Sequence, residues 1–110
     1  MNVYTIPEVK HYLNALITIL YEEGYFSYEG TAKRYIDELL DDILTQLPTK
    51  LKKPAPKHFT DKYGEGLYYA VFPKSKRTQW YAFFRMYRKD GEIIYQVRHV
   101  ENNHTAARFF

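Results

Sequence analysis

The chain has 110 residues, of which 45% are hydrophobic and 26% are charged. These values are typical of a folded protein with a modest core, and they predict a single domain over residues 1–110. The absence of cysteine excludes disulfide bonds, thiolate metal sites and a cysteine nucleophile. No run approaches the roughly 20 apolar residues that span a bilayer, and the first residues lack a signal-peptide pattern, so we expect a cytoplasmic protein with no membrane partner.

The net charge of +3 hides an uneven distribution along the chain. Residues 1–47 carry three Lys/Arg and eight Asp/Glu, a net charge of −5, whereas residues 48–110 carry thirteen and five, a net charge of +8. A basic half favours a polyanion as partner, although an unevenly charged solvated surface explains the counts equally well.

Two amphipathic helices are predicted in the first half of the chain. Apolar residues recur at helical spacing from Val9 to Leu20, and Gly24 is suited to end that helix. The second helix is predicted over Thr31–Leu47, with Pro48 ending it. The next segment, Pro48–Lys62, contains three prolines, and it is predicted to be extended and irregular.

Three strands are predicted in the second half, at Leu67–Phe72, Gln79–Arg88 and Glu92–Glu101. In the middle strand, alternate residues separate into two faces. One face is apolar, with Trp80, Ala82, Phe84 and Met86, and the other is aromatic with a cation, with Tyr81, Phe83, Arg85 and Tyr87. Asp90-Gly91 is typical of a tight hairpin turn between the last two strands.

Together these elements predict an α+β fold. We expect an antiparallel β-sheet meander of three to four strands, the fourth being a short strand at Met1–Tyr4, with the N-terminal two-helix hairpin packed on one face. The other face, ring-rich and cationic, is expected to be open.

In element order the chain resembles the RelE/ParE superfamily of toxins from type II toxin–antitoxin systems. The residues that carry the resemblance are Gly66-Leu67-Tyr68, Arg77–Arg85 and Ile93–His99. The resemblance implies a toxin that cleaves messenger RNA on the ribosome, or one that poisons DNA gyrase, and that is blocked by a cognate antitoxin. Val71 and Tyr81 depart from the family pattern, because many members have arginine at both positions.

Metal-independent RNA cleavage needs groups that transfer protons and cations that stabilise the developing phosphorane charge. The catalytic candidates are Arg85, His99 and His104, with Arg98 as a second stabilising cation. The candidates for binding RNA by charge or by stacking are Lys52, Lys53, Lys74, Lys76, Arg77, Tyr81, Phe83, Tyr87, Arg98 and Arg108. No metal-ligand spacing and no glycine-rich phosphate loop is present, so no metal and no cofactor are expected.

Structural interpretations of the same residues stay open. His99 shares its predicted face with Ile93, Tyr95 and Val97, which fits a histidine at the edge of a core, and His104 fits a turn residue. The aromatic face equally fits a non-catalytic protein that docks an antitoxin or a gyrase-like target, or that packs against a second copy of the chain.

Overall fold

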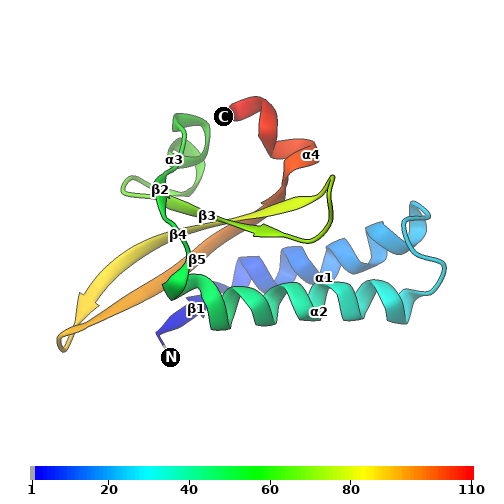
Figure 1. The fold of residues 1–110 in the computed structure, drawn as a ribbon, viewed down its shortest axis with the longest axis horizontal. Helices are drawn as coiled ribbons and strands as arrows, with labels where there is room; N and C mark the ends of the chain where they lie inside the picture. The colour runs from blue at the N-terminus through cyan, green and yellow to red at the C-terminus, as the bar shows by residue number, and fades with distance from the viewer. Residues whose placement is uncertain (1) are drawn as a thin grey trace.

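The computed structural model describes residues 2–110 and shows the predicted α+β fold, with two N-terminal helices packed on a sheet (Figure 1). The elements in chain order are β1 Val3–Thr5, α1 Pro7–Glu22, α2 Glu29–Gln46, the 3₁₀ turn η1 Leu47–Thr49, β2 Lys53–Pro54, α3 Lys57–Tyr63, β3 Tyr68–Pro73, β4 Gln79–Lys89, β5 Glu92–Asn102, α4 Asn103–Ala106 and the 3₁₀ turn η2 Ala107–Phe109.

The sheet has five strands in the order β1-β5-β4-β3-β2. The three long strands form the predicted antiparallel meander, and β1 adds to β5 in parallel. The strand expected at Met1–Tyr4 is β1, although Met1 lies outside the described residues. The fifth strand, β2, pairs only two residues with β3 at the opposite edge, and the sequence does not predict it.

The helices α1 and α2 lie side by side and antiparallel against one side of the sheet, which we call the helix face (Figure 1). In α2 the buried residues Ala32, Ile36, Leu39 and Ile43 follow the three- and four-residue spacing of one helical stripe. The turn after α1 contains Gly24 with φ +80°, as predicted from its freedom to adopt a left-handed conformation. Within residues 2–110, no helix is both long and apolar enough to cross a membrane.

The main core lies between these helices and the helix face. Trp80, Ala82 and Phe84 are buried there, so the predicted alternation in the middle strand is confirmed. A register shift between Phe83 and Phe84 pairs Phe84 with Val97 but Phe83 with His99, leaving one extra residue in β5. His99 therefore leaves the face of Val97, and the prediction that the two share a face is wrong.

The opposite side of the sheet, the second face, is covered rather than open. α3 and the C-terminal segment pack on it, and Phe59, Leu67, Phe83 and Ala106 form a second buried cluster. The prediction that Pro48–Lys62 is irregular is wrong, because it contains β2 and most of α3. Pro56 occupies the N-cap of α3 with φ −61°. A proline is tolerated at this position because the backbone N–H that it lacks would have no hydrogen-bond partner within the helix.

The β4–β5 hairpin turns at Asp90 and Gly91, with φ of +51° and +79°, as predicted. This end of the hairpin extends past the helices, on the side of the molecule opposite to the α1–α2 turn (Figure 1). The second face is thus crowded near the C-terminus and bare toward the hairpin end.

Candidate functional site

Two arginines lie on the second face where the covering by α3 ends. Arg98, in β5, donates three hydrogen bonds: from Nη1 to the carbonyl of Tyr63 (2.8 Å), from Nη2 to the hydroxyl of Tyr87 (2.8 Å) and from Nε to Oε1 of Gln96 (2.9 Å). Arg98 therefore links the end of α3 to β4 and β5.

Arg85 lies on the neighbouring strand, directly opposite Gln96. Its guanidinium carbon is 5.3 Å from the centre of the Tyr87 ring, and a Cβ placed on Gly66 would lie 3.6 Å from its Nε. We call Arg85, Tyr87, Gln96 and Arg98 the arginine cluster. Among residues 2–110, no carboxylate lies within ion-pair distance of either guanidinium group.

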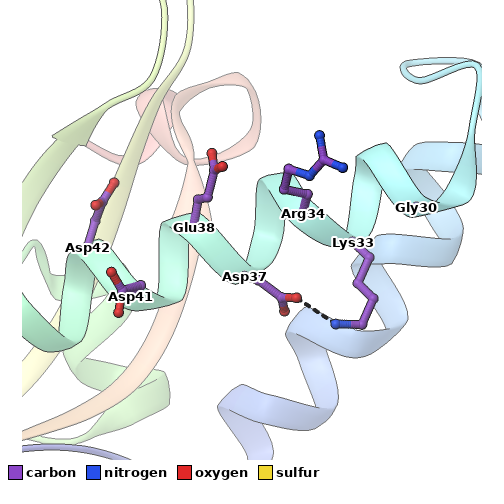
Figure 2. A pocket seen from close by; sticks show the side chains of 7 residues that line it. All are labelled: Gly30, Lys33, Arg34, Asp37, Glu38, Asp41 and Asp42. Carbon is purple, nitrogen blue, oxygen red and sulfur yellow. Dashed lines mark hydrogen bonds and ion pairs between the residues drawn. The ribbon is translucent and has the colours of Figure 1, made fainter.

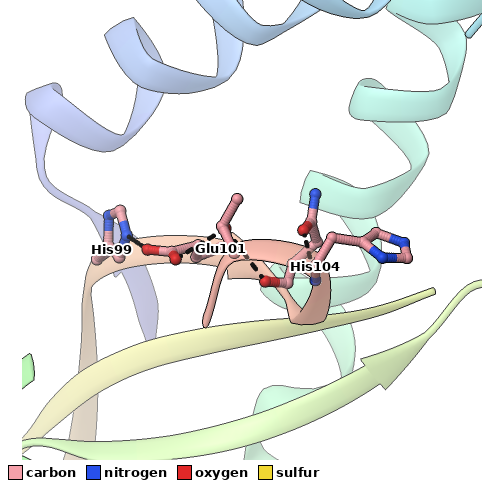
Figure 3. A network of polar contacts seen from close by, with 5 residues as sticks. His99, Glu101 and His104 are labelled. Carbon is pink, nitrogen blue, oxygen red and sulfur yellow. Dashed lines mark hydrogen bonds and ion pairs between the residues drawn. The ribbon is translucent and has the colours of Figure 1, made fainter. Parts of the chain in front are cut away.

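A network of polar side chains lies at the end of β5 (Figure 3), and it begins at His99, the residue after Arg98. One nitrogen of His99, Nε2, is 2.8 Å from Oε1 of Glu101, whose other oxygen accepts a hydrogen bond of 2.8 Å from the Thr105 hydroxyl. We call these three residues the histidine network. Because the carboxylate, and not the imidazole, is the middle group, the network is not a nucleophile–histidine–acid triad.

The surroundings of His99 are aromatic. Its ring stacks on Tyr63 of α3 with 4.4 Å between centroids and lies 5.4 Å from the ring of Tyr12 of α1. Tyr63 therefore contacts both parts of the site, since its carbonyl accepts from Arg98 and its ring covers His99.

Burial lowers the pKa of His99 below its ordinary value of 6.5, and the hydrogen bond to Glu101 only partly opposes this effect. The contact between them, although within ion-pair distance, is therefore a hydrogen bond from a neutral imidazole at neutral pH. Since Nε2 donates to Glu101, we assign the lone pair to Nδ1, and a neutral imidazole with a lone pair can act as a base.

The same carboxylate acts on two tyrosines. Burial first, and then the charge of Glu101, raises the pKa of Tyr12 to about 12 and that of Tyr63 above its ordinary value. Both hydroxyls are thus protonated throughout the physiological range.

His104 does not join His99 and Arg85. It lies in α4, and Figure 3 shows its ring pointing away from His99 on the other side of Glu101. Its Nε2 is 3.1 Å from the hydroxyl of Thr78, and its backbone N–H donates to the side chain of Asn102, which caps α4. The structure therefore places Arg85 and Arg98 at Tyr87, and Arg98 and His99 at Tyr63, whereas His104 lies apart from all of them.

The three rings predicted to stack on RNA bases differ in exposure. Phe83 is 0% exposed beneath Phe59 of α3, so the prediction that it contacts a base is wrong for this fold. Tyr81 is half-buried, with its ring 4.8 Å from that of Phe110. Tyr87, at 37% exposed, presents most ring surface of the three.

The predicted phosphate-binding residues do not form one surface. Lys74 pairs with Asp42 at 3.5 Å, and Lys52 donates to the carbonyls of Pro48 and Lys50. The others are exposed at three separate elements, the edge strand β2, the β3–β4 loop and η2: Lys53, Lys76, Arg77 and Arg108.

Two larger hollows mark the surface. One, of about 450 Å³, runs along the exposed side of α2, where acidic residues and the Lys33–Asp37 ion pair project from a single helix (Figure 2). The other, of about 400 Å³, lies between the α1–α2 turn and the β3–β4 loop, and His104 is among its lining residues. Among residues 2–110, no group of three or more His, Asp or Glu side chains is placed to hold a metal ion.

Sequence reasoning missed Tyr12, Tyr63 and Glu101. The spacing of His99 and Glu101, two apart on one strand, is a signal that could have identified the pair. Tyr63 gave no signal, because its segment was not assigned to any element.

Comparisons with protein-family models, with curated proteins and with solved structures found no match.

Proposed function

We propose that this chain is a toxin of the RelE/ParE type that cleaves messenger RNA without a metal ion in the cytoplasm, and that a cognate antitoxin restrains it. The element order of one strand, a helix hairpin and an antiparallel meander supports the proposal, because the resemblance is based on that order. The excess of Lys and Arg in residues 48–110 supports an anionic substrate.

The observation that carries the proposal is the arginine cluster next to a neutral histidine. Two guanidinium groups without carboxylate partners flank the exposed ring of Tyr87, which suits one phosphate and one stacked base. Such cations would stabilise the charge that develops on a phosphorane.

In this scheme His99 is the base. Its Nδ1 takes the proton of the 2′-hydroxyl, the 2′-oxygen bonds to phosphorus, and the bond from phosphorus to the 5′-oxygen breaks. The leaving oxygen takes a proton from the Tyr87 hydroxyl, which receives a hydrogen bond from Arg98. The products are a 2′,3′-cyclic phosphate and a 5′-hydroxyl, and the scheme assigns no role to His104.

The test uses a short, end-labelled single-stranded RNA in buffer with a chelator. We expect wild-type protein to bind and cut it, and to leave an RNA with a 2′-deoxy sugar at the cleaved position intact. His99→Gln, whose amide can still donate to Glu101, should bind normally and not cut. Arg85→Gln should bind more weakly, whereas Arg34→Gln, on exposed α2, should match wild type.

A second candidate is a binding protein of the same fold without catalysis, which docks an antitoxin or a gyrase-like target. Two observations favour it: the His99 side chain is only 12% exposed, and the two positions where the family pattern has arginine, Val71 and Tyr81, pair with each other on neighbouring strands. Co-purification of a small acidic protein, with RNA left uncut by wild type, would establish this candidate and reject the first.

A further inference from the structure

The 400 Å³ hollow at the α1–α2 turn, which we call the aromatic cavity, is not where the proposed reaction takes place, although Tyr12 and Thr105, which contact His99 and Glu101, are among its lining residues. Its walls come from α1, α2, β4 and α4 and from the β3–β4 loop, so distant parts of the chain form it together. Its volume is within the range of small-molecule sites in proteins.

One end of the aromatic cavity is apolar, with Leu16, Ile19 and Leu20 of α1. Its middle is lined by rings in fixed positions. Trp80 donates a hydrogen bond of 2.9 Å to the Tyr35 hydroxyl, and the Phe26 ring lies 5.3 Å from the ring of Tyr35. Such a wall suits a flat aromatic group, because the rings offer edges and faces without having to rearrange.

The other end is polar. The Lys74 ammonium lies 5.4 Å from the centre of the Tyr35 ring, and the side chain is only 14% exposed. Its one carboxylate partner, Asp42, is 3.5 Å away, which leaves N–H donors of the ammonium free for another acceptor. His104 and Thr78, 3.1 Å apart, add further hydrogen-bonding groups at this end.

From this polarity we propose that the aromatic cavity binds a small aromatic carboxylate, with the ring against Tyr35 and Phe26 and the carboxylate at Lys74. A single negative charge fits better than a phosphate dianion, because Glu23 lines the cavity and Asp42 already neutralises part of the Lys74 charge. The site is separate from the arginine cluster, which lies on the second face.

Trp80 is the only tryptophan of the chain, so its indole N–H gives a single resonance in a two-dimensional nitrogen–proton NMR spectrum. The probes are phenylacetate and its neutral isostere phenylacetamide. We expect phenylacetate to shift the Trp80 resonance saturably with one site per chain, and the amide to bind about tenfold more weakly.

Variants at both ends distinguish this site from non-specific binding. Lys74→Gln should weaken phenylacetate binding about tenfold and leave amide binding unchanged, whereas Lys76→Gln, an exposed residue of the same loop, should change neither. Ile19→Glu should abolish binding of both probes by placing a charge at the apolar end, and Thr18→Glu, exposed one residue away, should not.

The proposal is overturned if phenylacetate leaves the Trp80 resonance unchanged, if the amide binds as tightly as the acid, or if Lys74→Gln and Lys76→Gln act alike. Because Ile19→Glu leaves the Lys74–Asp42 pair intact, it tests the site even if Lys74→Gln disturbs the fold.

Discussion

The indole nitrogen of Trp80 and the hydroxyl of Tyr35 lie 2.9 Å apart, and this hydrogen bond joins β4 to α2 across the main core. Tyr35→Phe would leave the Trp80 N–H, which is buried in the core, without its acceptor. We expect the free energy of unfolding to fall by about 1–3 kcal/mol. Urea titration followed by Trp80 fluorescence measures it, with Tyr28→Phe on the exposed surface as control. Equal stability of the two variants would contradict the prediction.

Gly64 is in a backbone conformation with φ +112° that other residues rarely adopt, and a Cβ there would lie 2.5 Å from Nη1 of Arg98. Gly64→Ala should therefore displace the guanidinium group from the Tyr63 carbonyl and cost about 1–3 kcal/mol of stability. Gly30→Ala, in α2 with no atom within 4 Å of the added Cβ, should instead stabilise the protein by up to about 1 kcal/mol. Thermal unfolding of wild type and of the two variants measures these changes in stability. A Gly64→Ala protein as stable as wild type would contradict the prediction, because it would show that the Arg98 guanidinium group can move without destabilising the fold.

The helix face was predictable because its periodicity is strong. Alternation at Trp80, Ala82 and Phe84 and helical spacing at Ile36, Leu39 and Ile43 each identify one buried side, and burial of that side stabilises the element. The α+β class follows from the order of these elements.

The second face was not predictable in the same way. The pattern at Tyr81 and Phe83 shows only that this side is aromatic, and what covers it depends on α3 and the C-terminal segment, which are too short to show a helical periodicity. Phe59 is the one fully buried residue of α3, too little to produce a period.

The position of His99 depends on a single extra residue in β5. Strict alternation places His99 with Val97 toward the helices, and the register shift opposite Phe83 moves it to the ring of Tyr63 instead. Bulges have no reliable mark in a single sequence, so the meeting of Arg98, Tyr63 and His99 could not be derived before the structure.

Because of Tyr12, we expect the stability of the folded chain to fall at alkaline pH. Burial and the charge of Glu101 raise its pKa from 10.0 to about 12, so the folded chain keeps a proton that the unfolded chain releases. This contribution to stability is complete below pH 10 and is lost as the pH rises through 12. The difference between wild type and Tyr12→Phe in ultraviolet absorbance during an alkaline titration isolates the one phenol. A difference spectrum that titrates near 10 would contradict the assignment.

Because of His99, we expect the stability of the folded chain to fall at acid pH as well. Its pKa is below 6.5 in the folded chain, chiefly because of burial, so near and below pH 6.5 the unfolded chain binds a proton that the folded chain excludes. The contribution of His99 to stability is therefore present above pH 6.5 and is lost as the pH falls. His99→Gln should flatten the fall in unfolding free energy over that window.

Glu101→Gln tests the cause of the shift. Because the Glu101 carboxylate raises the pKa of His99 against the larger effect of burial, its removal should lower that pKa further. Proton NMR titration of the imidazole in wild type and variant measures both values, and Glu92→Gln, an exposed carboxylate at the far end of β5, is the control. A pKa that rises in Glu101→Gln would mean that the carboxylate does not hold His99 in this position, and the proposed base would lose its orienting group.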